Sequence, residues 1–190
     1  MALHDMGRDI ATSNRQTPTL LVLSPHPDDL ELSCGLLCHK AMLMGWNVHE
    51  IVLTDGAAGG NDPRIFHTEQ HRQMRIAEAK RGGAQLGVES IEFLGHADSK
   101  LVRDLPSAIA TVLERLELLS PLLIAFQSAS DTHSDHSGTH VATMSALEQY
   151  KKEIFSLEYC FWGKDDYQNI ILTHPAGMQA KESAIKEHKS

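Results

Sequence analysis

The stretch Thr19-Leu20-Leu21-Val22-Leu23-Ser24 decides the fold, and Pro25-His26-Pro27-Asp28-Asp29 follows it directly. A short apolar run bounded by polar residues and a proline is typical of a strand buried on both faces of a parallel sheet. Similar runs recur along the chain, separated by segments with helical spacing. This alternation predicts a parallel sheet covered by helices on both faces. We therefore expect an α/β fold, a three-layer α/β/α sandwich with a Rossmann-like, mostly parallel sheet.

The remaining elements are predicted from the same two patterns. Strands are expected at 19–24, 47–54, 90–94 and 122–126, with two shorter ones at 157–162 and 170–173. Helices are expected at 31–45, 68–86 and 106–119, then in a segment that ends near 152, and in the tail from 176. The Gly- and Asp-rich segment 54–66 is a long loop, and long loops in compact domains are commonly functional. Residues 1–17 are expected to be a flexible segment that precedes one domain spanning 18–190.

Composition excludes several classes of function. The 190 residues carry a net charge of −8, and an acidic surface repels the phosphates of nucleic acid. The three cysteines form no CxxC pair, which favours a reducing compartment. The polar N-terminus has no apolar core of a secretory signal, and no stretch approaches the ~20 apolar residues of a membrane helix. We therefore expect a cytoplasmic protein without a membrane span and without a nucleic-acid partner; homo-oligomerisation is left open.

The segment after the first strand, His26-Pro27-Asp28-Asp29, has residue types that bind metal ions. Two prolines stiffen the backbone around His26, and adjacent acids in a tight turn point in different directions. One acid can join His26 on a cation while its neighbour faces an open coordination position, and the cation relieves the repulsion between the carboxylates. The alternative is that the two acids cap the helix that begins near Glu31, where negative charge is favourable.

The segment after the fourth strand, Asp131-Thr132-His133-Ser134-Asp135-His136, continues to His140 and is equally rich in ligands. Imidazole and carboxylate suit zinc, and a catalytic zinc usually takes three protein ligands and one water. The alternative is a polar helix N-terminus that happens to contain histidines. Ligands bind at the carboxyl ends of parallel strands, where both segments are expected to lie. Their coincidence favours one metal site built from both.

These residues resemble a known family. His26-Pro27-Asp28-Asp29 is similar to the HPDD signature of the N-acetylglucosaminyl-phosphatidylinositol de-N-acetylase (PIG-L/LmbE-like) family, and His133-Ser134-Asp135-His136 to its HPDH signature. Between them, Thr54-Asp55-Gly56-Ala57-Ala58-Gly59 resembles the TDGExG loop of the family. Arg75-Ile76-Ala77-Glu78, followed by Leu86-Gly87-Val88, resembles its RxxEA…LGV helix, and Phe93-Leu94-Gly95 with Asp98 resembles its strand and acidic loop. The resemblance covers about residues 20 to 140.

The resemblance implies an LmbE-like catalytic domain that removes the acetyl group from an N-acetylglucosamine-type amino sugar or its conjugate. It implies that His26, Asp29 and His136 hold zinc, or iron(II) in vivo, and that Asp28 is the general base. His133 would polarise the acyl carbonyl, with Asp135 holding its ring. Arg75 and Asp98 would contact the sugar. Arg72, one helical turn away, could replace Arg75, and Arg75 could instead form a surface ion pair with Glu78 or Glu69.

The chain also departs from the family pattern. Leu30 stands where an acid commonly follows HPDD, with Glu31 one position later, and Ser134 replaces the proline of HPDH. The C-terminal part is expected to be shortened where relatives carry residues that cover the cleft. Two other functions stay open: a metal-dependent amidohydrolase acting on another N-acyl small molecule, and a non-catalytic sugar-binding protein. The absence of a GxGxxG turn after the first strand disfavours a nucleotide-binding protein.

Overall fold

The computed structural model of the chain describes residues 17–162 and 174–190. The segment predicted to be flexible, 1–17, lies outside the described residues except for Thr17, and the strand predicted at 170–173 lies outside them entirely.

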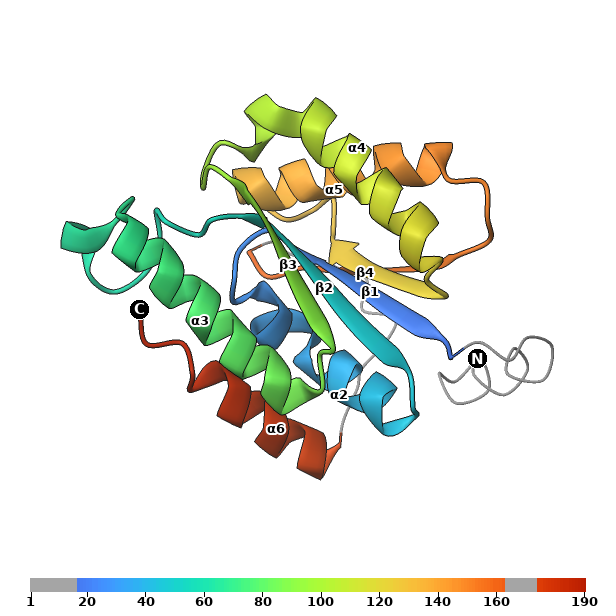
Figure 1. Ribbon diagram of the computed structural model, residues 1–190, viewed down its shortest axis with the longest axis horizontal. Coiled ribbons are helices and arrows are strands. Elements are labelled where there is room, and N and C mark those ends of the chain that lie inside the picture. The colour runs from blue at the N-terminus through green and yellow to red at the C-terminus, as the bar shows by residue number, and fades with distance from the viewer. Residues whose placement is uncertain (1–16, 163–173) are drawn as a thin grey trace.

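A central sheet of parallel strands forms the middle layer (Figure 1). Its strands lie in the order β3-β2-β1-β4-β5 and all neighbours pair in parallel. Their bounds are β1 Thr19–Ser24, β2 Asn47–Thr54, β3 Ser90–His96, β4 Leu123–Gln127 and β5 Phe155–Tyr159. The predicted fold class is thereby confirmed, and the first four strands lie within a few residues of their predicted positions.

Helices cover both faces of the sheet. On one face lie the π-helical turn η1 (Leu30–Cys34), α2 (Gly35–Leu43), α3 (Glu69–Leu86) and α6 (Pro175–Ile185), and on the other η3 (Leu101–Asp104), α4 (Leu105–Leu119) and α5 (Ser134–Gln149) (Figure 1). A short 3-10 turn, η2 (Pro63–Ile65), interrupts the predicted long loop. Across residues 17–162 and 174–190, no helix combines the length and the hydropathy that crossing a bilayer requires.

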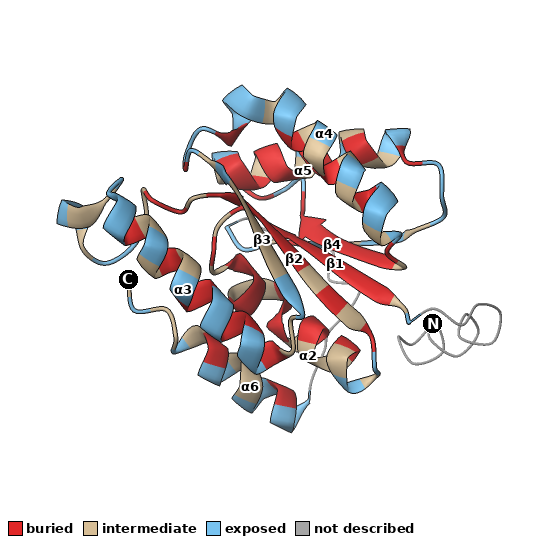
Figure 2. Cartoon of the chain, in the orientation of Figure 1, coloured by how far each residue is buried: buried red, intermediate tan, exposed pale blue. Residues whose placement is uncertain are grey.

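The alternation of side chains along β1 explains the layers. Leu20 and Val22 pack into the core beneath α2 and α6, while Leu21 and Leu23 pack into the core beneath α4 and α5. All four side chains are fully buried. Figure 2 shows β1 buried in the middle of the sheet, with a partly exposed edge strand β3 and helices whose outer faces are exposed. Because β1 is apolar on both faces, it can bury side chains in both hydrophobic cores only from the middle layer of such a sandwich.

The strand order places the candidate site. The chain leaves β1 toward β2 on one side, and β4 leads to β5 on the other, so the order reverses between the neighbours β1 and β4. In open parallel sheets, ligands bind at the carboxyl ends of the strands at this reversal. The residues after β1 and after β4 are the two segments that the sequence predicts to bind metal.

Candidate metal centre

The turn after β1 directs Asp29 back toward His26. The backbone N–H of His26 donates to Oδ2 of Asp29 at 2.9 Å, and Nδ1 of the same ring lies 3.2 Å from that oxygen. Asp29 precedes η1, yet its carboxylate makes no capping hydrogen bond to that turn. Asp29 is buried, with 3% of its surface exposed. The helix-capping interpretation of this acid is therefore not what the structure shows.

The segment after β4 supplies the second half of the cluster from the N-terminus of α5. His133 is the N-cap of that helix, and its Nδ1 accepts a hydrogen bond from the backbone N–H of Asp135 at 3.2 Å. Ser134 occupies the first helical position, where proline is common, so the missing proline does not prevent the helix from starting there. His136 follows in the first turn of the helix and is fully buried, with its Nε2 3.3 Å from Nδ1 of His26.

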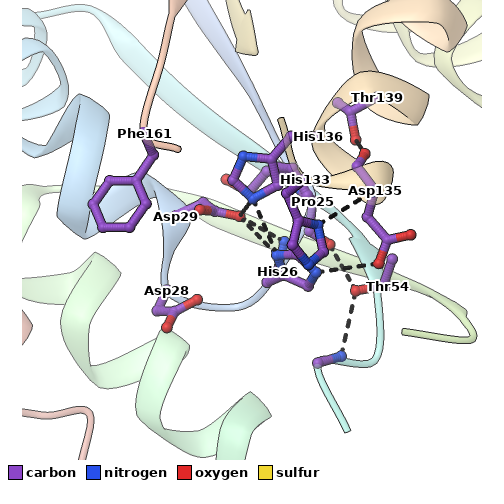
Figure 3. Close-up of polar contacts among 12 residues, drawn as sticks. Pro25, His26, Asp28, Asp29, Thr54, His133, Asp135, His136, Thr139 and Phe161 are labelled. Carbon is purple, nitrogen blue, oxygen red and sulfur yellow. Dashed lines mark hydrogen bonds and ion pairs between the residues drawn. The ribbon is translucent and has the colours of Figure 1, made fainter. Parts of the chain in front are cut away.

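Three donor atoms from the two segments converge on one point (Figure 3). Nδ1 of His26, Oδ2 of Asp29 and Nε2 of His136 lie 3.2, 3.4 and 3.3 Å apart. A tetrahedral zinc with bonds of about 2.0–2.1 Å has its ligand atoms roughly 3.3–3.4 Å apart. These three residues therefore fit one face of a zinc coordination sphere. His133 also brings a ring nitrogen within 4.8 Å of ligand atoms of His26 and His136.

In each of the two histidines, the ring nitrogen that is not one of the three donor atoms lies close to a carboxylate. Nε2 of His26 lies 3.2 Å from Oδ2 of Asp135, and Nδ1 of His136 lies 2.9 Å from Oδ2 of Asp131. Metal-binding histidines usually donate their second ring N–H to such a partner, which orients the ring and raises its basicity. Asp131 has no role in the sequence-based interpretation, although it stands in the His-rich segment two residues before His133.

The position of Asp135 differs from the expected one. Its carboxylate accepts from the backbone N–H groups of Ser99 and Leu101, at 2.6 and 3.1 Å, and faces His26. Its contact with His133 is made by its backbone N–H and not by its carboxylate. Asp135 therefore orients the ring of His26, and helix capping orients the ring of His133.

A cleft of about 410 Å³ opens beside this cluster and is lined by His26, Asp28, Asp29, Arg75, Asp98 and His133, among others. Asp28 is about one quarter exposed and pairs with Arg75, whose Nη2 lies 3.1 Å from its Oδ1. Arg72 instead binds Asp55 at 2.7 Å. Of the two candidate arginines, Arg75 is the one that lines the cleft, and it pairs there with Asp28 and not with Glu78 or Glu69.

Aromatic residues form one rim of the cleft, which the sequence-based interpretation did not include among the site residues. Phe161 and Trp162 follow β5 and line the cleft, with 40% and 60% of their surfaces exposed. We refer to these two residues as the aromatic rim. The sequence pattern predicted a strand at 157–162 that includes both residues, whereas β5 ends at Tyr159 and leaves them at the carboxyl edge of the sheet, where such sheets bind ligands.

The electrostatics of the cluster favour a bound cation. Burial lowers the pKa of His26, but the carboxylates of Asp135, Asp29 and Asp98 outweigh it and hold that pKa well above its usual range. Burial likewise lowers the pKa of His136, and Asp29 and Asp131 raise it above its usual value. Burial raises the pKa of Asp29, but His136 and His26 shift it well below its usual range. In the metal-free protein, positive charge on the imidazoles thus compensates the buried carboxylates.

A metal ion bound by these histidines would therefore be held more tightly as the pH rises. A metal ion can take Nδ1 of His26 and Nε2 of His136 only after their protons leave, and both pKa values lie above 6.5. The same protonated imidazoles stabilise the metal-free fold below that pH and cease to do so as the pH rises through the raised values. We expect the apparent zinc affinity, measured by chelator competition between pH ~6 and ~8, to increase steadily. A pH-independent affinity would show that these histidines are not the ligands.

Comparison with known proteins agrees with this geometry. The family model described as GlcNAc-PI de-N-acetylase (PIG-L) matches residues 21–147, which contain every site residue discussed so far except the aromatic rim. The chain belongs to the PIG-L family. It is 33% identical over 185 residues to the diacetylchitobiose deacetylase of Thermococcus kodakarensis. The alignment covers 90% of this chain and 69% of the relative.

Other relatives of the PIG-L family extend the comparison. The 1D-myo-inositol 2-acetamido-2-deoxy-alpha-D-glucopyranoside deacetylase of a Mycobacterium species (strain KMS) is 27% identical over 177 residues, 80% of this chain and 58% of the relative. The crystal structure of the zinc-inhibited form of teicoplanin deacetylase superposes with a TM-score of 0.75 at 18% identity, covering 90% of this chain and 84% of that one. The last comparison shows the shared fold. The two curated relatives named above are deacetylases of N-acetylglucosamine-type molecules, and this chain spans 69% and 58% of their lengths.

Proposed function

We propose that this member of the PIG-L family is a zinc-dependent deacetylase that hydrolyses the N-acetyl group of an N-acetylglucosamine-type amino sugar or its conjugate. One observation carries the proposal: donor atoms of His26, Asp29 and His136 lie 3.2 to 3.4 Å apart beside a cleft that also holds Asp28 and His133. A zinc ion held by these three residues would lower the pKa of water and polarise the acyl carbonyl. Iron(II) suits the same ligands.

We assign the proton transfer to Asp28. Its carboxylate lines the cleft next to Asp29, and the contact with Arg75 holds it in position. In hydrolysis, Asp28 accepts the proton of the attacking water as the new C–O bond forms. The same proton is then returned to the amide nitrogen, so that the C–N bond breaks with a neutral amine as the leaving group. The products are acetate and a free amino sugar.

We assign stabilisation of the developing oxyanion to His133. Because its Nδ1 accepts the backbone N–H of Asp135, the neutral ring carries its proton on Nε2. Burial and the positive charges of His26 and His136 lower the pKa of His133, so the neutral form predominates at neutral pH. A neutral Nε2–H donor serves this role without a charge, and one such donor typically contributes about 10²- to 10³-fold to turnover.

Arg75 and Asp98 are proposed to bind the hydroxyl groups of the sugar. Arg75 is 5% exposed, and its Nε has no hydrogen-bond partner among the described residues. Asp98 accepts from the backbone N–H of Ala58 at 2.8 Å, and its Oδ1 lies 3.4 Å from Nε2 of His26. Both side chains line the cleft in which a sugar would lie. An arginine and a carboxylate together provide the donor and the acceptor that a hydroxyl group requires.

Acetate release tests the proposed function directly. The zinc-loaded protein is incubated with N-acetylglucosamine, N,N'-diacetylchitobiose, an N-propionyl analogue and an N-acetyl amino acid, and acetate (or propionate) and free amine are quantified. We expect equimolar acetate and amine from the amino sugars, abolished by a chelator and restored by zinc. Activity confined to the N-acetyl amino acid would favour a different amidohydrolase. Tight sugar binding without release of either product would favour a non-catalytic binding protein.

A further inference from the structure

Asp131 connects parts of the molecule that the proposed mechanism treats separately. It lies in the loop between β4 and α5 and is 3% exposed. Its Oδ1 accepts from the backbone N–H of His133 at 3.1 Å. Its Oδ2 accepts from Nδ1 of His136 at 2.9 Å and from the backbone N–H groups of Phe161 and Trp162 at 3.0 and 3.2 Å. One buried carboxylate thus binds two different chain segments: the segment that carries His133 and His136, and the residues that follow β5.

The contact with His136 determines which nitrogen of that ring can bind a metal. A carboxylate facing Nδ1 requires a proton on that nitrogen, so the lone pair of the neutral ring resides on Nε2. That nitrogen is the one that faces Asp29 and His26, at 3.4 and 3.3 Å. Nδ1 of His26, Oδ2 of Asp29 and Nε2 of His136 together form what we call the donor triangle. Without Asp131 the ring of His136 could adopt the other tautomer or rotate, and the donor triangle would lose one of its three atoms.

The contacts with Phe161 and Trp162 determine the position of the aromatic rim. These two residues follow the edge strand β5, and their side chains are largely exposed. Asp131 binds both of their N–H groups, and Thr132 donates through its Oγ1 to the carbonyl of Trp162 at 2.6 Å. Adjacent residues of the β4–α5 loop therefore attach the rim to the helix that carries His136.

We propose that Asp131 is a positioning residue that sets both the metal-binding nitrogen of His136 and the aromatic rim of the cleft. This inference rests on the metal site of the proposed function. It predicts that a substitution of Asp131 changes both the metal affinity and the mobility of the aromatic rim, although its carboxylate does not belong to the donor triangle. Partners of metal-binding histidines typically contribute 10- to 100-fold to metal affinity.

The first measurement is the zinc affinity of the metal-stripped protein, obtained by competition with a chromophoric chelator. We expect Asp131→Asn and Asp131→Ala to weaken zinc binding by about 10- to 100-fold, with alanine at the upper end because it removes every acceptor. Thermal unfolding of the metal-free variants shows whether they fold. If the alanine variant does not fold, the asparagine variant decides, since its one side-chain oxygen can still accept from the backbone N–H of His133.

The second measurement follows the aromatic rim. Trp46 and Trp162 are the two tryptophans of the chain, so Trp162 is the sole tryptophan in a Trp46→Phe background. There, Asp131→Asn should lower the fluorescence anisotropy of Trp162, because its backbone loses a fixed contact. Thr132→Val is the matched control: it removes a rim contact without touching His136, so it should lower the anisotropy and leave the zinc affinity unchanged.

The outcomes separate the two proposals. Zinc binding by the wild type with equal affinity in the Asp131 variants would overturn the role of Asp131 alone. A Trp162 anisotropy that does not respond to Asp131→Asn would overturn its effect on the rim. Failure of the wild type to bind zinc would overturn the proposed function as well. Zinc binding without deacetylation would contradict the proposed reaction. The zinc affinities of the Asp131 variants would then still decide the role of Asp131.

Discussion

Replacing Asp28 with asparagine is expected to lower deacetylase turnover by about 10²- to 10⁴-fold while zinc stays bound, because asparagine cannot accept a proton. Asp28 lines the cleft, but its carboxylate contacts Arg75 and takes no part in the triangle formed by His26, Asp29 and His136. The loss should therefore appear in kcat, with zinc content close to that of the wild type. Steady-state kinetics combined with metal analysis of the purified variant provides the measurement.

The matched control for Asp28→Asn is Glu92→Gln. Glu92 on β3 also forms a carboxylate–guanidinium pair, with Arg115 of α4 at 2.6 Å, and it does not line the cleft. Loss of charge there should leave kcat unchanged. If the two variants were equally active, the proton would have to be accepted by another group, and the role proposed for Asp28 would be wrong.

Replacing His136 with alanine is expected to lower bound zinc from about one equivalent to near zero and to remove the activity. The affinity should fall by more than about 100-fold, because the loss of a ligand exceeds the loss of a group that only orients one. The side chain is fully buried between Asp29 and Asp131, so its removal also takes an imidazole partner from each of these two buried carboxylates. Metal analysis and zinc titration of the folded variant provide the test.

His140 offers a control for this substitution on the same helix. It lies one turn after His136, its Nδ1 is 3.0 Å from the carbonyl of Gln127, and it does not line the cleft. We expect His140→Ala to keep both zinc and activity. Retention of stoichiometric zinc by His136→Ala would mean that another set of ligands holds the metal, for example one that includes His133.

The local parts of this protein followed from the sequence alone. Apolar runs such as Leu20–Leu23 predicted buried parallel strands, and the polar segments after two of them predicted where ligands gather. This worked because strand burial, turns and helix starts depend on residues close together in the chain. The rule that ligands bind at the carboxyl ends of parallel strands then related the segment after the first strand to the segment after the fourth without any knowledge of coordinates. The choice of His26 and His136 within these segments came from the resemblance to the family.

Only the tertiary structure decided which side chains meet. Spacing along the chain could not tell that Asp135 faces His26 and not His133, or that Arg75, instead of Arg72, pairs with Asp28. Nor could it show that Asp131 binds the N–H groups of Phe161 and Trp162, which lie 30 and 31 positions further along the chain. The physical reason is that such contacts depend on how separate elements pack and on side-chain rotation. Neither is determined by local backbone preference.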